Sequence, residues 1–220
     1  ASHDTPEGTI FIPDRVAKGN PVLVIAEFPG RGKMLLDMMQ ADLNRAGIIV
    51  LLPTLPSTGP APGNPDLMPQ VKSLLQRLAT EHRLKPGRKC AFGFSAAGGM
   101  GIALALRNAN DFDGLIIAAA MMMDAGEPGR CARKDLPILM VCGDQDQMAG
   151  PDTMARLKKT LTTGGMTKIE EMVLANTDHM GVVQRQAGKY LAWVAGTPAQ
   201  TAPVTPATNL PRRLVCLWRG

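Results

Sequence analysis

The decisive stretch of this sequence is KCAFGFSAAGGM, residues 89–100. Its first half is apolar and of strand length, and an Ala/Gly-rich run typical of a helix continues after Ser95 to Asn110. A serine between such a strand and helix sits on a tight turn, which needs small residues two positions before it and two positions after it. Gly93 meets the first need, and Ala97 stands where glycine is usual. The pattern therefore predicts a strained turn that presents the Ser95 hydroxyl at the end of a strand.

Strand-like and helix-like segments alternate along the rest of the chain. Apolar runs of strand length occupy Val22–Ala26, Ile48–Leu52, Lys89–Gly93, Gly114–Ala120, Leu136–Cys142 and Lys168–Leu174. Helical patterns occupy Lys33–Ala46, Pro69–His82, the run after Ser95, Asp152–Thr162 and Val182–Val194. Strands separated by helices predict an α/β fold with a mainly parallel central sheet and helices on both of its faces. The carboxyl ends of the strands then share one edge, where ligands bind in such sheets.

Size and charge narrow the class of protein. The chain has 220 residues, enough for one domain with a sizeable core. No apolar run reaches the ~18–20 residues that a membrane-spanning helix requires, so we expect a soluble protein with no membrane span. The formal net charge is +5, and Arg212, Arg213 and Arg219 in an acid-free C-terminal stretch account for most of it. Because only 4% of the residues are aromatic as well, the composition argues against nucleic-acid binding.

The composition changes after Gly196. We expect an α/β domain over residues 1–197 and a Pro/Thr-rich tail over residues 198–220. The sequence starts at Ala1 without a charged-then-apolar leader, which fits a cytoplasmic protein or a secreted one whose leader has been removed. The four cysteines include no C-x-x-C pair, so we expect free thiols that pack as small apolar residues.

A serine hydroxyl needs a base within hydrogen-bonding reach before it can act as a nucleophile. The chain has three histidines. His3 lies in the N-terminal segment, and His82 ends a predicted helix, where a positive charge complements the carbonyl groups, so a structural role suits it. His179 follows the last predicted strand and falls on the same sheet edge as Ser95. We therefore expect His179 to be the base.

A third group, an acid that orients the base, should lie between the serine and the histidine in the chain. The strand Leu136–Cys142 runs into GDQD, residues 143–146. Asp146 is the predicted acid, because a G-x-x-D turn reaches back toward the histidine, and Asp144 is the alternative. A solvated acidic turn is the competing interpretation.

Reaction at a carbonyl group also needs fixed hydrogen-bond donors for the developing oxyanion. The backbone N–H of Ala96 is one candidate, because it follows the serine at the start of a helix. The second should come from the loop after the first predicted strand, where Phe28 is chosen because Pro29 has no N–H. Gly30 and Gly32 suggest a phosphate-binding turn, but the longer nucleotide-binding patterns are absent, so we expect no nucleotide site.

Together these features resemble the α/β-hydrolase superfamily over roughly residues 10–195. The resemblance rests on GFSAAGG at residues 93–99, on GDQD and on Asp178-His179. Within the superfamily, VIAEF at residues 24–28 is similar to the dienelactone hydrolase branch.

That branch has a glutamate at the position of Glu27 but usually a cysteine nucleophile, where this chain has Ser95. A serine esterase of the same build therefore fits better than a dienelactone hydrolase. The resemblance implies a catalytic triad of Ser95, Asp146 and His179, with no cofactor and no metal.

The same resemblance bears on how open the site is. Only residues 121–135 separate two of the later predicted strands, so we expect no large cap domain. The rim of the site would then consist of Glu27, Met121, Met122 and the Pro-rich loop 53–69. Methionine side chains more often serve packing, but they are also adaptable enough to line an unspecific apolar site.

The resulting interpretation is a serine hydrolase of the carboxylesterase type that acts on small to medium-sized esters. A thioesterase or an amide hydrolase on the same triad is an alternative, and so is a non-catalytic binding module on the same fold. The sequence leaves the substrate and the oligomeric state open.

Overall fold

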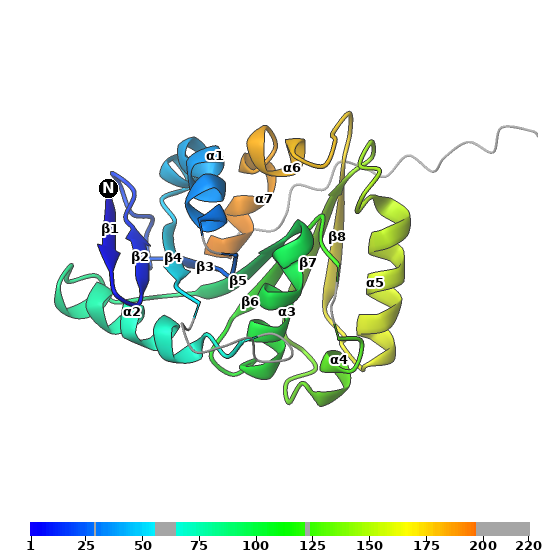
Figure 1. Cartoon of the computed structure of the whole chain (residues 1–220), viewed down its shortest axis with the longest axis horizontal. Helices are drawn as coiled ribbons and strands as arrows, with labels where there is room; N and C mark the ends of the chain where they lie inside the picture. Colours follow the sequence, from blue (N-terminus) through cyan, green and yellow to red (C-terminus); the bar gives the residue numbers. More distant parts are fainter. Residues whose placement is uncertain (29, 56–64, 122–123, 197–220) are drawn as a thin grey trace, which may run out of the picture.

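The computed structural model of the chain describes residues 1–28, 30–55, 65–121 and 124–196. In this part the chain forms an eight-stranded sheet in the order β1-β2-β4-β3-β5-β6-β7-β8 (Figure 1). The strands are β1 (Ser2–Thr5), β2 (Gly8–Phe11), β3 (Val22–Ile25), β4 (Ile49–Pro53), β5 (Lys89–Phe94), β6 (Gly114–Ala118), β7 (Ile138–Gly143) and β8 (Ile169–Leu174). Strands β3 to β8 run parallel to one another. Strand β2 pairs antiparallel with β4, and the edge strand β1 pairs antiparallel with β2. The mainly parallel sheet expected from the sequence is confirmed.

Helices cover both faces of this sheet (Figure 1). One face packs against α1 (Arg31–Ala46), α6 (Gly181–Gln184), α7 (Gly188–Leu191) and the 3₁₀ turn η2 (Ala192–Ala195). The other face packs against α2 (Met68–Thr80), α3 (Gly98–Arg107) and α5 (Pro151–Thr163), and the short α4 (Glu127–Arg130) contacts α3 and α5. Covering both faces requires apolar side chains on both sides of a strand, and every residue of β3 and β6 is buried accordingly.

The parallel strands bring their carboxyl ends to one edge of the sheet. Glu27 follows β3, Ser95 follows β5, Asp146 follows β7 and His179 follows β8. Between β6 and β7 the described residues hold the four-residue helix α4. No large cap domain therefore covers this edge in the described part of the chain, as the sequence predicted.

The N-terminal hairpin was not predicted. Strand β1 has the sequence SHDT and is mostly exposed, so it lacks the apolar alternation that identifies a strand. Its partner β2 is buried but has only four residues. Gly8 allows β2 to approach β4, because a Cβ at this position would lie 2.1 Å from the backbone oxygen of Leu52.

The prediction of one continuous helix over Val182–Val194 is wrong. The structure divides this segment into α6, α7 and η2. A Cβ at Gly188 would lie 2.8 Å from Oδ1 of Asp42, so the start of α7 runs close to α1. The break still buries apolar side chains, and Tyr190 donates a hydrogen bond from its buried hydroxyl to the backbone oxygen of Val182.

Some sequence predictions fall partly or wholly outside the described residues. These are the tail over residues 198–220, Met122, and most of the Pro-rich loop 53–69. The cysteines that the structure describes, Cys90, Cys131 and Cys142, are free and buried.

Candidate active site

Ser95 lies on a tight turn between β5 and α3. Its φ of 54° falls in the left-handed region that residues other than glycine rarely adopt. The 3₁₀ turn η1 (Ser95–Ala97) then leads directly into α3. A Cβ at Gly93 would lie 2.5 Å from the backbone oxygen of Gly98, so the close return of the chain depends on a glycine here. The strained turn holds the serine side chain at the sheet edge.

Gly98, the first residue of α3, is a position after the turn that has no room for a side chain. A Cβ there would lie 2.2 Å from the Cβ of Ala120. Ala97, one position earlier, is accommodated with its side chain in the core. The alanine at the position where glycine is usual therefore leaves the turn intact.

The His179 ring lies between Ser95 and Asp146. Its Nε2 is 2.7 Å from the Ser95 Oγ, and its Nδ1 is 2.8 Å from the Asp146 Oδ2. An ionised carboxylate only accepts hydrogen bonds, so Nδ1–H donates to Asp146 and Nε2 is left to accept the serine hydroxyl proton. The ring also stacks on Phe94, with 5.2 Å between centroids. Phe94 was not singled out from the sequence, where nothing distinguishes it from other strand residues.

Asp146 is fixed in place by the turn between β7 and α5. Its side chain is fully buried, and its Oδ1 accepts the backbone N–H groups of Met148 and Ala149 at 2.8 and 2.9 Å. Both carboxylate oxygens are thus engaged, one with the backbone and one with His179. Asp144, the alternative acid, is exposed and accepts the backbone N–H of Thr177 instead.

The two predicted oxyanion donors differ in their surroundings. The Ala96 N–H belongs to η1, directly after Ser95 and at the amino end of the helical segment, where backbone N–H groups favour a negative charge. The Phe28 N–H donates a hydrogen bond to Oε1 of Glu27 at 2.9 Å. The second predicted donor is therefore occupied by a side chain of the same loop.

Glu27 is a buried carboxylate with few partners. Its residue is 5% exposed, and among the described residues its Oε2 has no hydrogen-bond partner. Arg31, the first residue of α1, places its Nε 3.9 Å from Oε1. Burial raises the pKa of Glu27 above its usual value, while the Phe28 N–H and the Arg31 charge oppose this rise. The sequence placed Glu27 on the rim of the site without revealing its bond to Phe28.

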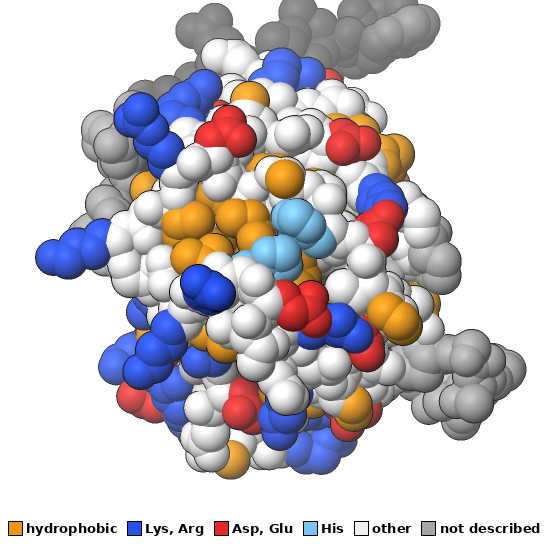
Figure 2. Space-filling view, turned by 90° about the vertical axis from the view of Figure 1, so that its left-hand side faces the viewer, with side chains coloured by type: hydrophobic (Ala, Val, Ile, Leu, Met, Phe, Trp, Pro, Cys, Tyr) orange, Lys and Arg blue, Asp and Glu red, His pale blue; other side chains and the backbone are white. Residues whose placement is uncertain are grey.

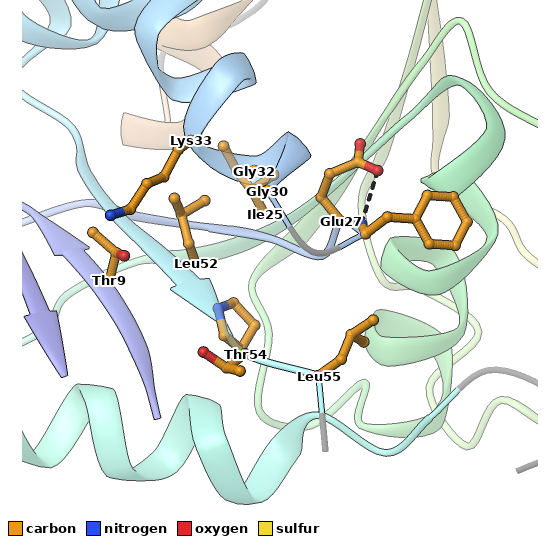
Figure 3. Close-up of a pocket in the computed structure, with 11 residues that line it drawn as sticks. Thr9, Ile25, Glu27, Gly30, Gly32, Lys33, Leu52, Thr54 and Leu55 are labelled. Carbon is orange, nitrogen blue, oxygen red and sulfur yellow. Dashed lines mark hydrogen bonds between the residues drawn. The ribbon is translucent and has the colours of Figure 1, made fainter. Parts of the chain in front are cut away.

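A cavity of about 310 Å³ adjoins this loop (Figure 3). Its wall includes Ile25, Glu27, Phe28, Lys33, Leu52 and Leu55. Figure 3 shows the Lys33 side chain extending toward Thr9 at one side, while the Glu27 side chain lies at the other. Lys33 forms an ion pair with Asp4 at 2.8 Å. The described part of the predicted loop 53–69 thus contributes Leu55 to a cavity beside the predicted oxyanion donor.

The other predicted site residues lie as follows. Met121 is 53% exposed just beyond β6, and Met122 lies outside the described residues. The rings of His3 and His82 contact each other in a tilted arrangement, with 4.5 Å between their centroids. They belong to the β1 end of the sheet, where Figure 2 shows paired histidine side chains beside a hydrophobic patch, whereas His179 follows β8 at the opposite end.

Comparison with solved structures shows that the chain has the α/β-hydrolase fold. An S-formylglutathione hydrolase from Agrobacterium tumefaciens matches with a TM-score of 0.61 and 15% identity, covering 89% of this chain and 93% of that one. An α/β serine hydrolase homologue from Coxiella burnetii matches with a TM-score of 0.59 and 18% identity, covering 88% and 95%. Est1E from Butyrivibrio proteoclasticus matches with a TM-score of 0.57 and 12% identity, covering 90% and 99%.

At these identities the likeness is one of fold. No family model matches the sequence, and no curated protein matches it either. Among the described residues, no helix is long and apolar enough to cross a membrane, and no group of three or more His, Cys, Asp or Glu side chains could hold a metal ion.

Proposed function

We propose that the protein is a serine hydrolase of the carboxylesterase type, which cleaves carboxylic esters of small to medium size. The observation that carries the proposal is the hydrogen-bonded series from Asp146 through His179 to Ser95, with contacts of 2.8 and 2.7 Å. A serine hydroxyl is a poor nucleophile without a base in contact and a third group to orient that base. In this series His179 is the base and Asp146 is the group that orients it.

Acylation begins when the Ser95 Oγ attacks the ester carbonyl carbon. His179 accepts the hydroxyl proton at Nε2, and the imidazolium is stabilised by Asp146, which stays ionised. His179 then gives the same proton to the leaving alcohol as the carbon–oxygen bond breaks. The product is an acyl-Ser95 intermediate, which water hydrolyses with His179 again acting as the base.

The carbonyl oxygen becomes negative in both steps and needs fixed donors. The Ala96 and Phe28 N–H groups are assigned this role, because one follows the nucleophile and the other lies in the loop between β3 and α1. Removing one such donor typically costs about 10²–10³-fold in kcat. The mechanism uses no cofactor and no metal.

The surroundings of the site bear on the size of the substrate. The short connection between β6 and β7 leaves no large lid over the sheet edge among the described residues. We therefore infer that the site is uncapped and accepts short acyl chains. Activity should therefore be highest on short p-nitrophenyl esters, and a strong preference for long-chain triglycerides would count against this assignment.

Labelling by a fluorophosphonate probe tests the reaction class, because only an activated serine reacts quickly. We expect the protein to be labelled and to hydrolyse p-nitrophenyl acetate, and Ser95→Ala to lose both properties while keeping its melting temperature. An unlabelled wild-type protein would favour a non-catalytic binding module on the same fold. A matched panel of esters, thioesters and amides then distinguishes the carboxylesterase from the other two hydrolases.

A further inference from the structure

Glu27 makes a contact that the proposed reaction does not use. Its Oε1 accepts the Phe28 N–H at 2.9 Å, and its side chain is 2% exposed. In the part of the chain that the structure describes, Oε2 is buried without a hydrogen-bond partner. The nearby cations provide little charge compensation for the carboxylate, because the Nε of Arg31 is 3.9 Å from Oε1 and Lys33 is paired with Asp4. The carboxylate is thus bonded to a backbone donor that the oxyanion requires.

We propose that Glu27 closes the oxyanion hole in the resting enzyme, and that esters with a hydrogen-bond donor next to the scissile carbonyl open it. The inference rests on the proposed ester hydrolysis and on the assignment of the Phe28 N–H as the second oxyanion donor. It adds to that function a residue that limits turnover and a chemical class of preferred substrate.

The closing effect follows from competition for one donor. The Phe28 N–H points at Oε1 of Glu27, so it is not available to a substrate oxygen. Both acceptors are negative, so a carboxylate and an oxyanion placed at the same donor repel each other. A hydrogen bond to a charged acceptor is also stronger than one to the neutral carbonyl of an incoming ester. The carboxylate must therefore move away before the Phe28 N–H can bind the oxyanion.

The opening effect follows from the unused oxygen of the same carboxylate. A buried Oε2 without a partner is unfavourable, so a donor brought by the substrate gains an unusually good acceptor. A hydroxyl or ammonium group on the carbon next to the carbonyl can form this bond and draw Glu27 away from Phe28. The cavity of about 310 Å³ that Glu27 borders leaves room for such a movement. A purely apolar acyl group offers no replacement bond.

The experiment compares two isosteric substrates, the p-nitrophenyl esters of glycolate and propionate, which differ by a hydroxyl in place of a methyl group. For each protein, kcat and kcat/KM are divided by the rate of hydroxide-catalysed hydrolysis of the same ester. We expect the wild-type enzyme to prefer glycolate by about tenfold on this scale. This is the effect of one charge-assisted hydrogen bond.

Substitution at Glu27 tests the closing effect. In Glu27→Leu the preference for the glycolate ester should disappear. We expect kcat on the propionate ester to rise about tenfold and kcat on the glycolate ester to change little. Glu27→Gln keeps an acceptor without the charge and should lie between the two proteins. Glu127→Gln is the control: it alters another buried carboxylate, which pairs with Arg107 away from the oxyanion loop, and it should leave the substrate ratio unchanged.

A role for Glu27 in folding alone would lower the melting temperature without moving the ratio of the two substrates. The proposal is overturned if the wild-type enzyme shows no preference for glycolate, or if the folded Gln and Leu variants are slower than wild type on propionate. If Glu27→Leu does not fold, the wild-type ratio and Glu27→Gln still decide. Failure of the proposed function can be distinguished from failure of this inference, because in the first case the wild-type protein would not react with the fluorophosphonate.

Discussion

Asp144 binds Thr177 across the two loops that carry the acid and the base. Its Oδ1 accepts the Thr177 N–H at 3.0 Å, and the Thr177 backbone oxygen accepts the N–H of Gln145 at 3.0 Å. A Cβ at Gly143 would lie 1.9 Å from that same oxygen, so the loops touch at a point where only glycine fits. The two aspartates of the GDQD turn thus have different tasks: Asp144 joins the loops, and Asp146 contacts His179.

Asp146→Asn should reduce kcat on p-nitrophenyl acetate on the order of 10⁴-fold, because an amide favours the wrong histidine tautomer. The Asn side chain can still accept the backbone N–H groups of Met148 and Ala149, so the fold should be preserved. Steady-state kinetics and thermal melting measure the two effects. A variant that stays fully active would remove Asp146 from the mechanism.

Asp144→Ala should weaken the contact between the two loops and affect catalysis only indirectly. It removes one hydrogen bond to a backbone N–H, so we expect a loss of about 1 kcal/mol in the free energy of unfolding. The kcat should fall less than tenfold, since Asp146 and His179 keep their contact. Urea unfolding and kinetics on the same preparation test this. A larger loss of kcat than in Asp146→Asn would reverse the assignment of the two carboxylates.

Gly98→Ala should destabilise the turn that carries Ser95. The new Cβ would lie 2.2 Å from the Cβ of Ala120, so α3 or β6 must shift. Overpacking of this kind typically costs 1–3 kcal/mol. Ala97→Gly is the matched control, and its cost should be about 1 kcal/mol or less. Equal losses of unfolding free energy in the two variants would contradict the special role of Gly98.

The sheet and the three residues brought together at its edge follow from patterns that are local in the sequence. Buried parallel strands appear in a sequence as apolar runs. The residues that follow these strands reach the same edge of the sheet, and this does not depend on the exact bounds of the helices. Ser95, Asp146 and His179 could therefore be chosen one at a time, each by its place after a strand. Gly93 could be chosen because the tight turn demands it.

What escaped prediction depends on contacts between distant segments or on single rotamers. The strand Ser2–Thr5 is polar and exists because it pairs with β2. The break between α6 and α7 covers residues 185–187, and α7 then begins at Gly188 close to Asp42 of α1. The bond between Glu27 and the Phe28 N–H depends on one side-chain conformation, which no spacing of residue types encodes.

The raised pKa of Glu27 gives stability a pH dependence with a definite sign. Because burial raises this pKa in the folded protein, the native state binds more protons than the unfolded state between the usual glutamate pKa and the raised one. Stability therefore falls as pH rises through that interval and levels off above it. Glu27→Gln has no such titration, and Gln can still accept the Phe28 N–H.

The melting temperature of Glu27→Gln relative to wild type should accordingly increase from pH 4 to pH 7. Every other titrating group is common to both proteins, so the difference between their melting curves isolates Glu27. If the Glu27→Gln difference is flat or falls with pH, the carboxylate ionises at least as easily in the folded protein as in the unfolded chain. Its burial would then carry no electrostatic cost.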